Sequence, residues 1–331
     1  MRNLLIVLLA AVVGFLSAYI GADLAAWYEN PSSSVSLGGG APLEPPKESS
    51  AYPVEEAWQT MIASVQERIQ RNPGKVGIYI KDLRNDRVWT YGENEMFPSA
   101  SLVKLPIMAT VFQRVQEGKL SLDKRIAVNR RYRMGGSGRL KWFRDGSKFT
   151  LRDVIQWMIT ESDNTAMKMA IDTVGFAAFQ EELPRFGFRA TQVNPEGLSL
   201  SSGRVSRENY TTAAEMGMFL EKLYRKELVS PTASEIMTEL MKKLPTRKRL
   251  ATGLPYGWQI AHKTGLLRQA CHDVGIVYTP EGDYIICVLT GKNSSYRRAK
   301  ELIASVGKTM HQYFRSDSSI IVNLPAQKSQ S

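Results

Sequence analysis

Histidine is scarce in this chain of 331 residues, which has only three. They stand at His262, His272 and His311, without the spacing of zinc ligands, and no carboxylate–histidine grouping indicates a metal site. We therefore expect neither a metal ion nor another cofactor. Hydrophobic residues at 43% and charged residues at 23% are near the averages of globular proteins, which excludes wholesale disorder and a polytopic membrane protein.

Cysteine is equally scarce, with two residues, Cys271 and Cys287. They flank a Tyr-Thr-Pro-Glu-Gly-Asp-Tyr stretch that predicts a hairpin turn. The expected register puts a residue near 276 opposite Cys287, which leaves Cys271 beyond disulfide reach. We therefore expect two free, buried thiols.

A dense block of basic residues is also missing, although the formal charge is +11. The lysines and arginines are spread along the chain, unlike a nucleic-acid-binding arm, so no nucleic-acid partner is expected. A solvated basic surface is the simpler interpretation, and attraction to an anionic cell envelope is the alternative.

Only one long hydrophobic run occurs, at the N-terminus, where Arg2 precedes an uncharged stretch from Leu4 to Ile20. Residues 1–28 are interpreted as a secretory signal or a membrane anchor, because no strong A-x-A cleavage site follows. Residues 29–54, rich in Pro, Ser and Gly, predict a disordered linker. The folded domain, expected to be monomeric, is placed at residues 55–316, and residues 317–331 are expected to be a flexible tail.

Hydrophobic periodicity predicts strands at both ends of this domain. A helix is expected over 55–71, strands over 76–83 and 87–91, mostly helices over 101–244, then strands from Gln259 and a last helix over 296–314. The terminal strands must meet in one sheet. The fold class is therefore α/β (α+β), an antiparallel sheet flanked by the N- and C-terminal helices, with an all-helical lobe beside it and a cleft between the two.

Three Ser-x-x-Lys matches occur, and only the one at Ser101 and Lys104 opens an apolar helical run. A serine in the first turn of a core helix is near free backbone N–H groups and the positive end of the helix dipole, which favour an alkoxide and an oxyanion. A lysine three residues later lies on the same helix face. This pattern predicts Ser101 as a nucleophile, with Lys104 within reach of its hydroxyl group.

Two further motifs follow in the chain. Ser162-Asp163-Asn164 comes after an amphipathic segment and is expected to cap or join helices in the helical lobe. Lys263-Thr264-Gly265 is expected to end a strand that starts at Trp258, at the edge of the sheet. Either motif alone is weak.

In this order the three motifs resemble the signature of penicillin-binding proteins and class A β-lactamases, over about Glu55 to Phe314. The resemblance implies a β-lactamase/D,D-peptidase-like fold and acylation of Ser101 by a β-lactam or by a peptidoglycan peptide. It implies that Lys104 accepts the Ser101 proton, directly or through water. It implies an oxyanion hole formed by the backbone N–H groups of Ser101 and Leu266, which follows Gly265. Ser162 would relay a proton to the leaving nitrogen.

The resemblance also implies how substrate is held. Asn164 would bind the side-chain amide of the substrate, and Lys263 with Thr264 would bind its carboxylate. Some class A enzymes add an arginine near the start of the last helix, and Arg298 stands at about that place.

The chain departs from the class A pattern in the loop that carries the deacylating glutamate. Counting back from the Thr-Thr pair at 211–212 puts Glu196 at the glutamate position. The same count puts Asn194 and Asn209 where an ion pair would brace the loop, and Leu200 where an asparagine would hold water. Glu208, the other carboxylate, is expected at the surface. Three functions stay open: a β-lactamase, a D,D-peptidase of the penicillin-binding kind, and a lactam or muropeptide sensor without turnover.

Overall fold

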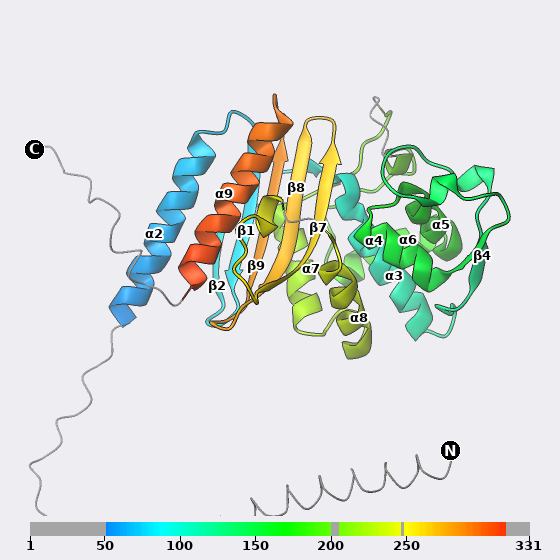
Figure 1. Ribbon diagram of the computed structural model, residues 1–331, viewed down its shortest axis with the longest axis horizontal. Helices are drawn as coiled ribbons and strands as arrows, with labels where there is room; N and C mark the ends of the chain where they lie inside the picture. Colours follow the sequence, from blue (N-terminus) through cyan, green and yellow to red (C-terminus); the bar gives the residue numbers. More distant parts are fainter. Residues whose placement is uncertain (1–50, 200–204, 246–247, 316–331) are drawn as a thin grey trace, which may run out of the picture. The chain divides into compact units, whose positions relative to one another are not determined.

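Strands from both ends of the domain meet in one antiparallel sheet in the computed structural model, which describes residues 51–199, 205–245 and 248–315 (Figure 1). The sheet has the order β2-β1-β9-β8-β7. Its strands are β1 (Lys75–Asp82), β2 (Arg87–Tyr91), β7 (Gln259–Leu267), β8 (Ala270–Tyr278) and β9 (Tyr284–Gly291). β1 pairs with β9, with Ile78 opposite Val288, which confirms the predicted meeting of the terminal strands.

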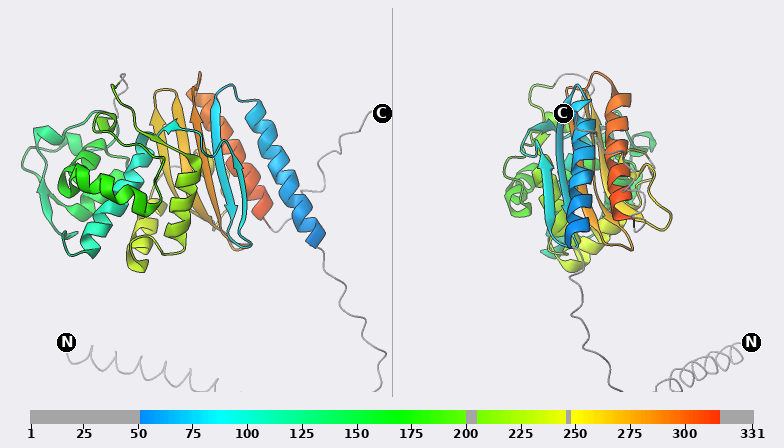
Figure 2. Two further views of the ribbon diagram at one scale, coloured as in Figure 1. Left: turned by 180° about the vertical axis from the view of Figure 1, so that it is seen from behind. Right: turned by 90° about the vertical axis from the view of Figure 1, so that its left-hand side faces the viewer.

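The first and last helices cover one face of this sheet, as Figure 2 shows. They are α2 (Ala51–Gln70) and α9 (Tyr296–Phe314). α9 has the predicted bounds, whereas α2 begins before the predicted Glu55. Periodic apolar residues such as Trp58 and Val65 of α2 are buried in a core between the helices and the sheet.

The other face of the sheet contacts α7, and a lobe of helices continues beyond it (Figure 1). The helices on this side are α3 (Lys104–Gln116), α4 (Leu151–Thr160), α5 (Asn164–Val174), α6 (Phe176–Phe186), α7 (Ala213–Tyr224) and α8 (Pro231–Lys242). Two small two-stranded sheets lie in the segments that connect these helices. β3 (Phe97–Pro98) pairs with β6 (Tyr210–Thr211), and β4 (Arg125–Ala127) pairs with β5 (Lys148–Thr150).

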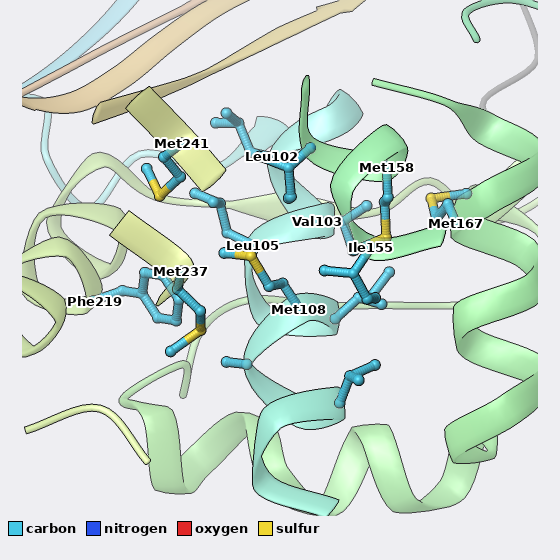
Figure 3. Close-up of a cluster of buried hydrophobic side chains, with 14 of the residues drawn as sticks. Leu102, Val103, Leu105, Met108, Ile155, Met158, Met167, Phe219, Met237 and Met241 are labelled. Carbon is cyan, nitrogen blue, oxygen red and sulfur yellow. The ribbon is translucent and has the colours of Figure 1, made fainter. Parts of the chain in front are cut away.

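Helix α3 is the centre of the second hydrophobic core, shown in Figure 3. Leu105 and Met108 of α3 are fully buried, and they lie among side chains of α4, α5, α7 and α8. The first nine residues of α3 are all buried, so this part of the helix cannot shift without disturbing a close-packed core. The residues at its N-terminus are therefore held in a fixed position.

The cysteines are free and buried, as predicted, although the expected register is wrong. Val274 lies opposite Cys287, and Thr290 lies opposite Cys271. The β8–β9 turn is centred one residue earlier than expected, and Cys271 still pairs with a residue other than Cys287.

None of the described helices is long and apolar enough to cross a membrane. Residues 1–28, residues 29–50 of the predicted linker and the predicted tail at 317–331 lie outside the described residues. The interpretations of these segments stay predictions.

Candidate active site

Ser101 lies in the short helix η1 (Ala100–Val103), which leads directly into α3. The preceding residue, Ala100, has a φ of +47°, a conformation that costs free energy for a residue with a side chain and occurs preferentially at functional sites. Leu102 and Val103 are buried in the core, while Ser101 is only partly buried. Ser101 was predicted in the first turn of the core helix, and it lies in a 3-10 turn that leads directly into that helix.

Lys104, the first residue of α3, is fully buried, and its ammonium group contacts four oxygen atoms. Its Nζ lies 3.1 Å from Ser101 Oγ, 3.1 Å from Ser162 Oγ, 2.5 Å from the Ser162 carbonyl and 2.8 Å from Asn164 Oδ1. All four are hydroxyl, carbonyl or amide oxygens, so no carboxylate is hydrogen-bonded to this buried amine in the described part of the chain.

Burial lowers the pKa of Lys104 well below its usual value, and the nearby Lys263 lowers it further, against a smaller opposite effect of Asp163. Both main causes favour the neutral amine. A neutral amine 3.1 Å from Ser101 Oγ can accept the hydroxyl proton, which is what a general base for this serine requires.

Asp163 fixes the second motif at the start of α5. Its carboxylate caps the helix by accepting from Ala166 N at 2.9 Å and also accepts from Leu140 N at 2.8 Å. Ser162, with a φ of +55°, directs its Oγ between two lysines, 3.1 Å from Lys104 Nζ and 3.0 Å from Lys263 Nζ. The predicted helix cap is confirmed, and the hydroxyl of Ser162 is within hydrogen-bond distance of both ammonium groups.

A glycine-rich segment packs against this motif and was not predicted to belong to the site. Asn164 Nδ2 donates to the Gly135 carbonyl at 2.9 Å. A Cβ added to Gly138 would lie 2.1 Å from Asp163 Cγ, and one added to Gly136 would lie 2.8 Å from Asn164 Nδ2. The cluster of glycines in the sequence could have indicated this contact, because glycine permits such a close approach of the backbone.

The third motif lies within β7, not at its end, because the strand runs on from His262 to Leu267. β7 is the edge strand of the sheet, as predicted, so alternate backbone N–H groups are not used by a neighbouring strand. A Cβ on Gly265 would lie 3.2 Å from Ala100 Cβ, so the glycine lets β7 approach η1 closely. Thr264 and the exposed Leu266 flank it in the strand.

Lys263 is fully buried, and its Nζ donates to Ser162 Oγ and to the Thr264 carbonyl at 2.9 Å. Burial lowers the pKa of Lys263 to about 7, with Asp273 raising it and Arg249 lowering it by smaller amounts. Near pH 7 both the charged and the neutral form of this lysine are therefore populated, and no carboxylate among the described residues is hydrogen-bonded to it.

The arginine beside this strand is Arg249, which was not predicted from the sequence. It belongs to η5 (Arg249–Ala251), and its Nη1 donates to the carbonyls of Gly265 and His272 at 3.3 and 2.9 Å. Arg298, predicted for this role, is exposed, and its side chain has no hydrogen bond or ion pair with the described residues. No pattern in the sequence distinguishes Arg249, because its position depends on tertiary packing.

The three histidines are buried. His262 Nδ1 lies 2.9 Å from Asp273 Oδ1, whose carboxylate also accepts from Leu250 N. His272 Nε2 lies 2.7 Å from the Pro98 carbonyl, and Thr290 N donates to its Nδ1, which fixes a neutral ring. Burial lowers the pKa of His272 to about 4. Among the described residues, no group of three or more His, Cys, Asp or Glu side chains could hold a metal ion.

Glu196 is exposed, and its carboxylate makes no hydrogen bond to Lys104 or Ser101. The structure thus shows no contact that joins this predicted base to Ser101 or Lys104. Leu200 lies outside the described residues. Glu208 is half-buried, and burial raises its pKa, so the expectation of a plain surface residue is wrong.

The neck of this loop is closed by neutral amides. Asn194 N donates to Asn209 Oδ1 at 2.6 Å, and Asn194 Nδ2 donates to the Glu208 carbonyl at 3.1 Å. Ser99 N donates to the Asn209 carbonyl at 2.7 Å, which connects the neck to the segment just before Ser101. The two asparagines therefore meet where the count placed a bracing pair, without an ion pair.

Comparisons with known proteins agree with this geometry. A family model described as the beta-lactamase enzyme family matches residues 60–314. The extended-spectrum beta-lactamase PER-1 of Pseudomonas aeruginosa is 28% identical over 66% of this chain and 76% of that protein. The beta-lactamase of Bacillus licheniformis is 25% identical over 71% of this chain and 78% of that protein.

Solved structures of similar fold include another beta-lactamase. The structure of PBP-A is similar with a TM-score of 0.71 and 28% identity, covering 77% of this chain and 96% of that one. A beta-lactamase from Sphaerobacter thermophilus has a TM-score of 0.70 and 25% identity, covering 78% and 97%. A mutant of PBP-A was solved as an acyl-enzyme complex with penicillin G.

Proposed function

The chain belongs to the beta-lactamase enzyme family, and from that premise we propose that it opens the β-lactam ring through an acyl-enzyme on Ser101. The observation that carries the proposal is the contact of the buried Lys104 amine with Ser101 Oγ at 3.1 Å. A serine hydroxyl is a weak nucleophile until an adjacent base takes its proton, and a desolvated lysine can be that base.

Acylation would proceed by transfer of the Ser101 proton to Lys104 as Oγ attacks the lactam carbonyl carbon. The backbone N–H groups of Ser101 and Leu266 would stabilise the oxyanion. When the C–N bond breaks, the leaving nitrogen would take a proton from Ser162 Oγ, which lies 3.1 Å from Lys104 Nζ and recovers a proton from it. Lys104 returns to the neutral amine and Ser162 to the hydroxyl form, so the net result is transfer of the Ser101 hydroxyl proton to the leaving nitrogen.

Substrate would be held from both sides of Ser101. Asn164 would bind the side-chain amide, and Lys263 with Thr264 would bind the carboxylate. We assign to Arg249 the supporting positive charge that was predicted for Arg298, since Arg249 contacts the carbonyl of Gly265. The proposed chemistry needs no metal ion or cofactor.

Deacylation separates the β-lactamase from the second candidate, a D,D-peptidase or penicillin-binding protein that stays acylated by lactams. The exposed Glu196 and the uncharged neck at Asn194 and Asn209 favour the second candidate, as does the similarity to PBP-A. The similarity to PER-1 favours the first. For turnover, Glu196 would have to turn toward Ser101 in the acyl-enzyme.

The deciding experiment measures turnover of a chromogenic cephalosporin by the parent protein, Glu196→Gln and Glu208→Gln. If Glu196 activates the deacylating water, Glu196→Gln should lower turnover by about 10²- to 10⁴-fold and leave acylation intact. Glu208→Gln is the matched control and should retain turnover. A parent protein that is labelled by fluorescent penicillin but turns over no cephalosporin would contradict the β-lactamase proposal and leave the peptidase or sensor.

The location of the enzyme follows from the N-terminal segment. We propose that the chain is exported, that residues 1–28 act as a signal peptide or as an anchor in the cytoplasmic membrane, and that residues 29–54 link them to a monomeric catalytic domain facing the periplasm or the cell exterior. The apolar run from Leu4 to Ile20 after Arg2 supports this proposal.

A further inference from the structure

Most of the net charge of the chain is carried by one short segment, residues 124–148. This segment has nine lysines and arginines and a single acidic residue, Asp145, so its net charge is +8 of the +11 of the whole chain. The expectation that the basic residues are spread along the chain is therefore wrong for this segment. We call it the basic face.

The basic face lies on the part of the helical lobe that is turned away from the sheet. It contains β4, η2 (Arg130–Tyr132) and η3 (Leu140–Trp142), and it ends at the first residue of β5. Figures 1 and 2 show β4 and its neighbouring loops at this outer edge. Tyr132 and Leu140 are buried and attach the segment to the lobe.

Three of the nine cations are paired, and six are not. Arg131, Arg133 and Arg139 form ion pairs with Asp172, Asp145 and Glu161. The other six have no carboxylate partner among the described residues: Lys124, Arg125, Arg130, Lys141, Arg144 and Lys148. All of these except Lys141, which is half-buried, are exposed. The six positive charges repel one another, and binding to an anionic partner would offset this repulsion.

Trp142 lies within the basic face, and 79% of its surface is exposed. The Lys141 ammonium lies 5.2 Å from the centroid of its ring, so the exposed indole has a cation beside it and is not packed in the core. Tryptophan beside lysine and arginine is typical of the interfacial region of a bilayer, where the indole lies at headgroup depth and the cations contact anionic lipids.

We propose that the basic face docks the catalytic domain onto an anionic phospholipid bilayer. The inference rests on the proposed export of the chain, which places a membrane surface within its reach. It adds a second contact, through residues 124–148, to any attachment by the N-terminal segment.

Docking would also orient the active site. Lys141 Nζ donates to the Gly136 carbonyl, and Asn164 Nδ2 donates to the neighbouring Gly135 carbonyl. The basic face is therefore continuous with the segment that holds Asn164. A docked domain would present this side of the site to the membrane surface.

The test uses the full chain with vesicles made of equal parts phosphatidylglycerol and phosphatidylcholine, both with brominated acyl chains. Bromine quenches an indole inserted near the acyl chains, and the signal of Trp142 is the difference between the parent and Trp142→Phe. This signal should be quenched by the mixed vesicles and not by pure phosphatidylcholine vesicles. Raising the ionic strength from about 0.1 M to about 1 M should restore it, because the Debye length falls from about 10 Å to about 3 Å.

A charge variant separates docking from general folding effects. Arg130→Gln/Arg144→Gln/Lys148→Gln should lower the docking equilibrium by about 10²-fold, at about fivefold for each cation. The matched control, Lys168→Gln/Lys226→Gln/Lys308→Gln, removes three exposed lysines elsewhere and should dock like the parent. Both triple variants should acylate like the parent, so a failure of docking is distinguishable from a failure of the proposed function.

Three outcomes would overturn the proposal. They are equal quenching in neutral vesicles, equal docking of the two triple variants, and a parent protein that binds heparin or double-stranded DNA while Trp142 remains unquenched. The last result would identify a surface for soluble polyanions.

Discussion

At the scale of a single residue, the burial of Lys263 should determine the pH range in which acylation is fast. Its pKa is lowered to about 7, so the free enzyme loses this positive charge as the pH rises through 7. Since a neutral amine does not attract the substrate carboxylate, kcat/KM for acylation should fall on the alkaline side of this value. In Lys263→Arg the fall should move to a much higher pH, because the guanidinium stays charged up to about pH 12.

Stopped-flow measurement of acylation across pH checks this prediction. The control is a substrate whose carboxylate is esterified, which should show no alkaline fall caused by Lys263. An alkaline limb at the same pH in the parent and in Lys263→Arg would assign the titration to another group.

His272 makes a corresponding prediction for stability. Burial lowers its folded-state pKa to about 4 from a usual 6.5. Protonation is therefore less favourable in the folded state, and the unfolded chain binds more protons between these values. The free energy of unfolding should fall by about 3 kcal/mol from this residue alone as the pH drops from about 6.5 to about 4.

Urea unfolding of the parent and His272→Gln at pH 7 and pH 4 measures this contribution. The variant should start less stable, since it loses a contact to Thr290 N, but its acid loss should be smaller by about 3 kcal/mol. Burial also lowers the pKa of His311 to about 4. Both proteins should therefore still lose some stability in acid because of His311. An identical acid loss in the two proteins would refute the assignment.

At the scale of elements, the glycine segment holds the Ser162 motif in place. Gly138 has a φ of +100°, and a Cβ there would lie 2.1 Å from Asp163 Cγ. Gly146 has a similar φ of +87° but nothing within 4 Å of an added Cβ. The two positions therefore separate backbone strain from a steric clash.

Gly146→Ala should cost about 1 kcal/mol of stability and leave acylation unchanged. Gly138→Ala should cost more than about 3 kcal/mol and slow acylation, because Asp163 must move and Asn164 moves with it. Chemical denaturation and labelling rates with fluorescent penicillin measure both effects. Equal behaviour of the two variants would show that the close approach has no role.

Several elements and site residues could be predicted from the sequence, and others could not. The three motifs are local patterns next to periodic apolar residues, so Ser101 and Ser162 were assigned to the correct elements, and α9 has its predicted bounds. β7 was ended too early because polar residues of the motif were interpreted as the end of a strand. Arg249 was missed since η5 reaches β7 only through packing against α9 and β8.

At the scale of the whole molecule, residues far apart in the sequence form one site because two cores hold them. One core fixes α3, and with it Ser101 and Lys104, while the sheet fixes Lys263. The sequence order predicted this convergence because strands at both ends had to share a sheet. The position of the Glu196 carboxylate could not be predicted, since a loop without a bracing ion pair has no local pattern that fixes it.

The central claim is that Ser101 becomes acylated through the neutral Lys104 amine. Intact-protein mass spectrometry after brief mixing with penicillin tests it most directly, followed by peptide mapping of the parent, Ser101→Ala and Lys104→Arg. One penicillin mass should be added to the parent, on the peptide that contains Ser101. None should be added to Ser101→Ala, and Lys104→Arg, which cannot supply a neutral base at neutral pH, should acylate at least about 10²-fold more slowly. An adduct of the same mass on Ser101→Ala, or on a peptide without residue 101, would contradict the account.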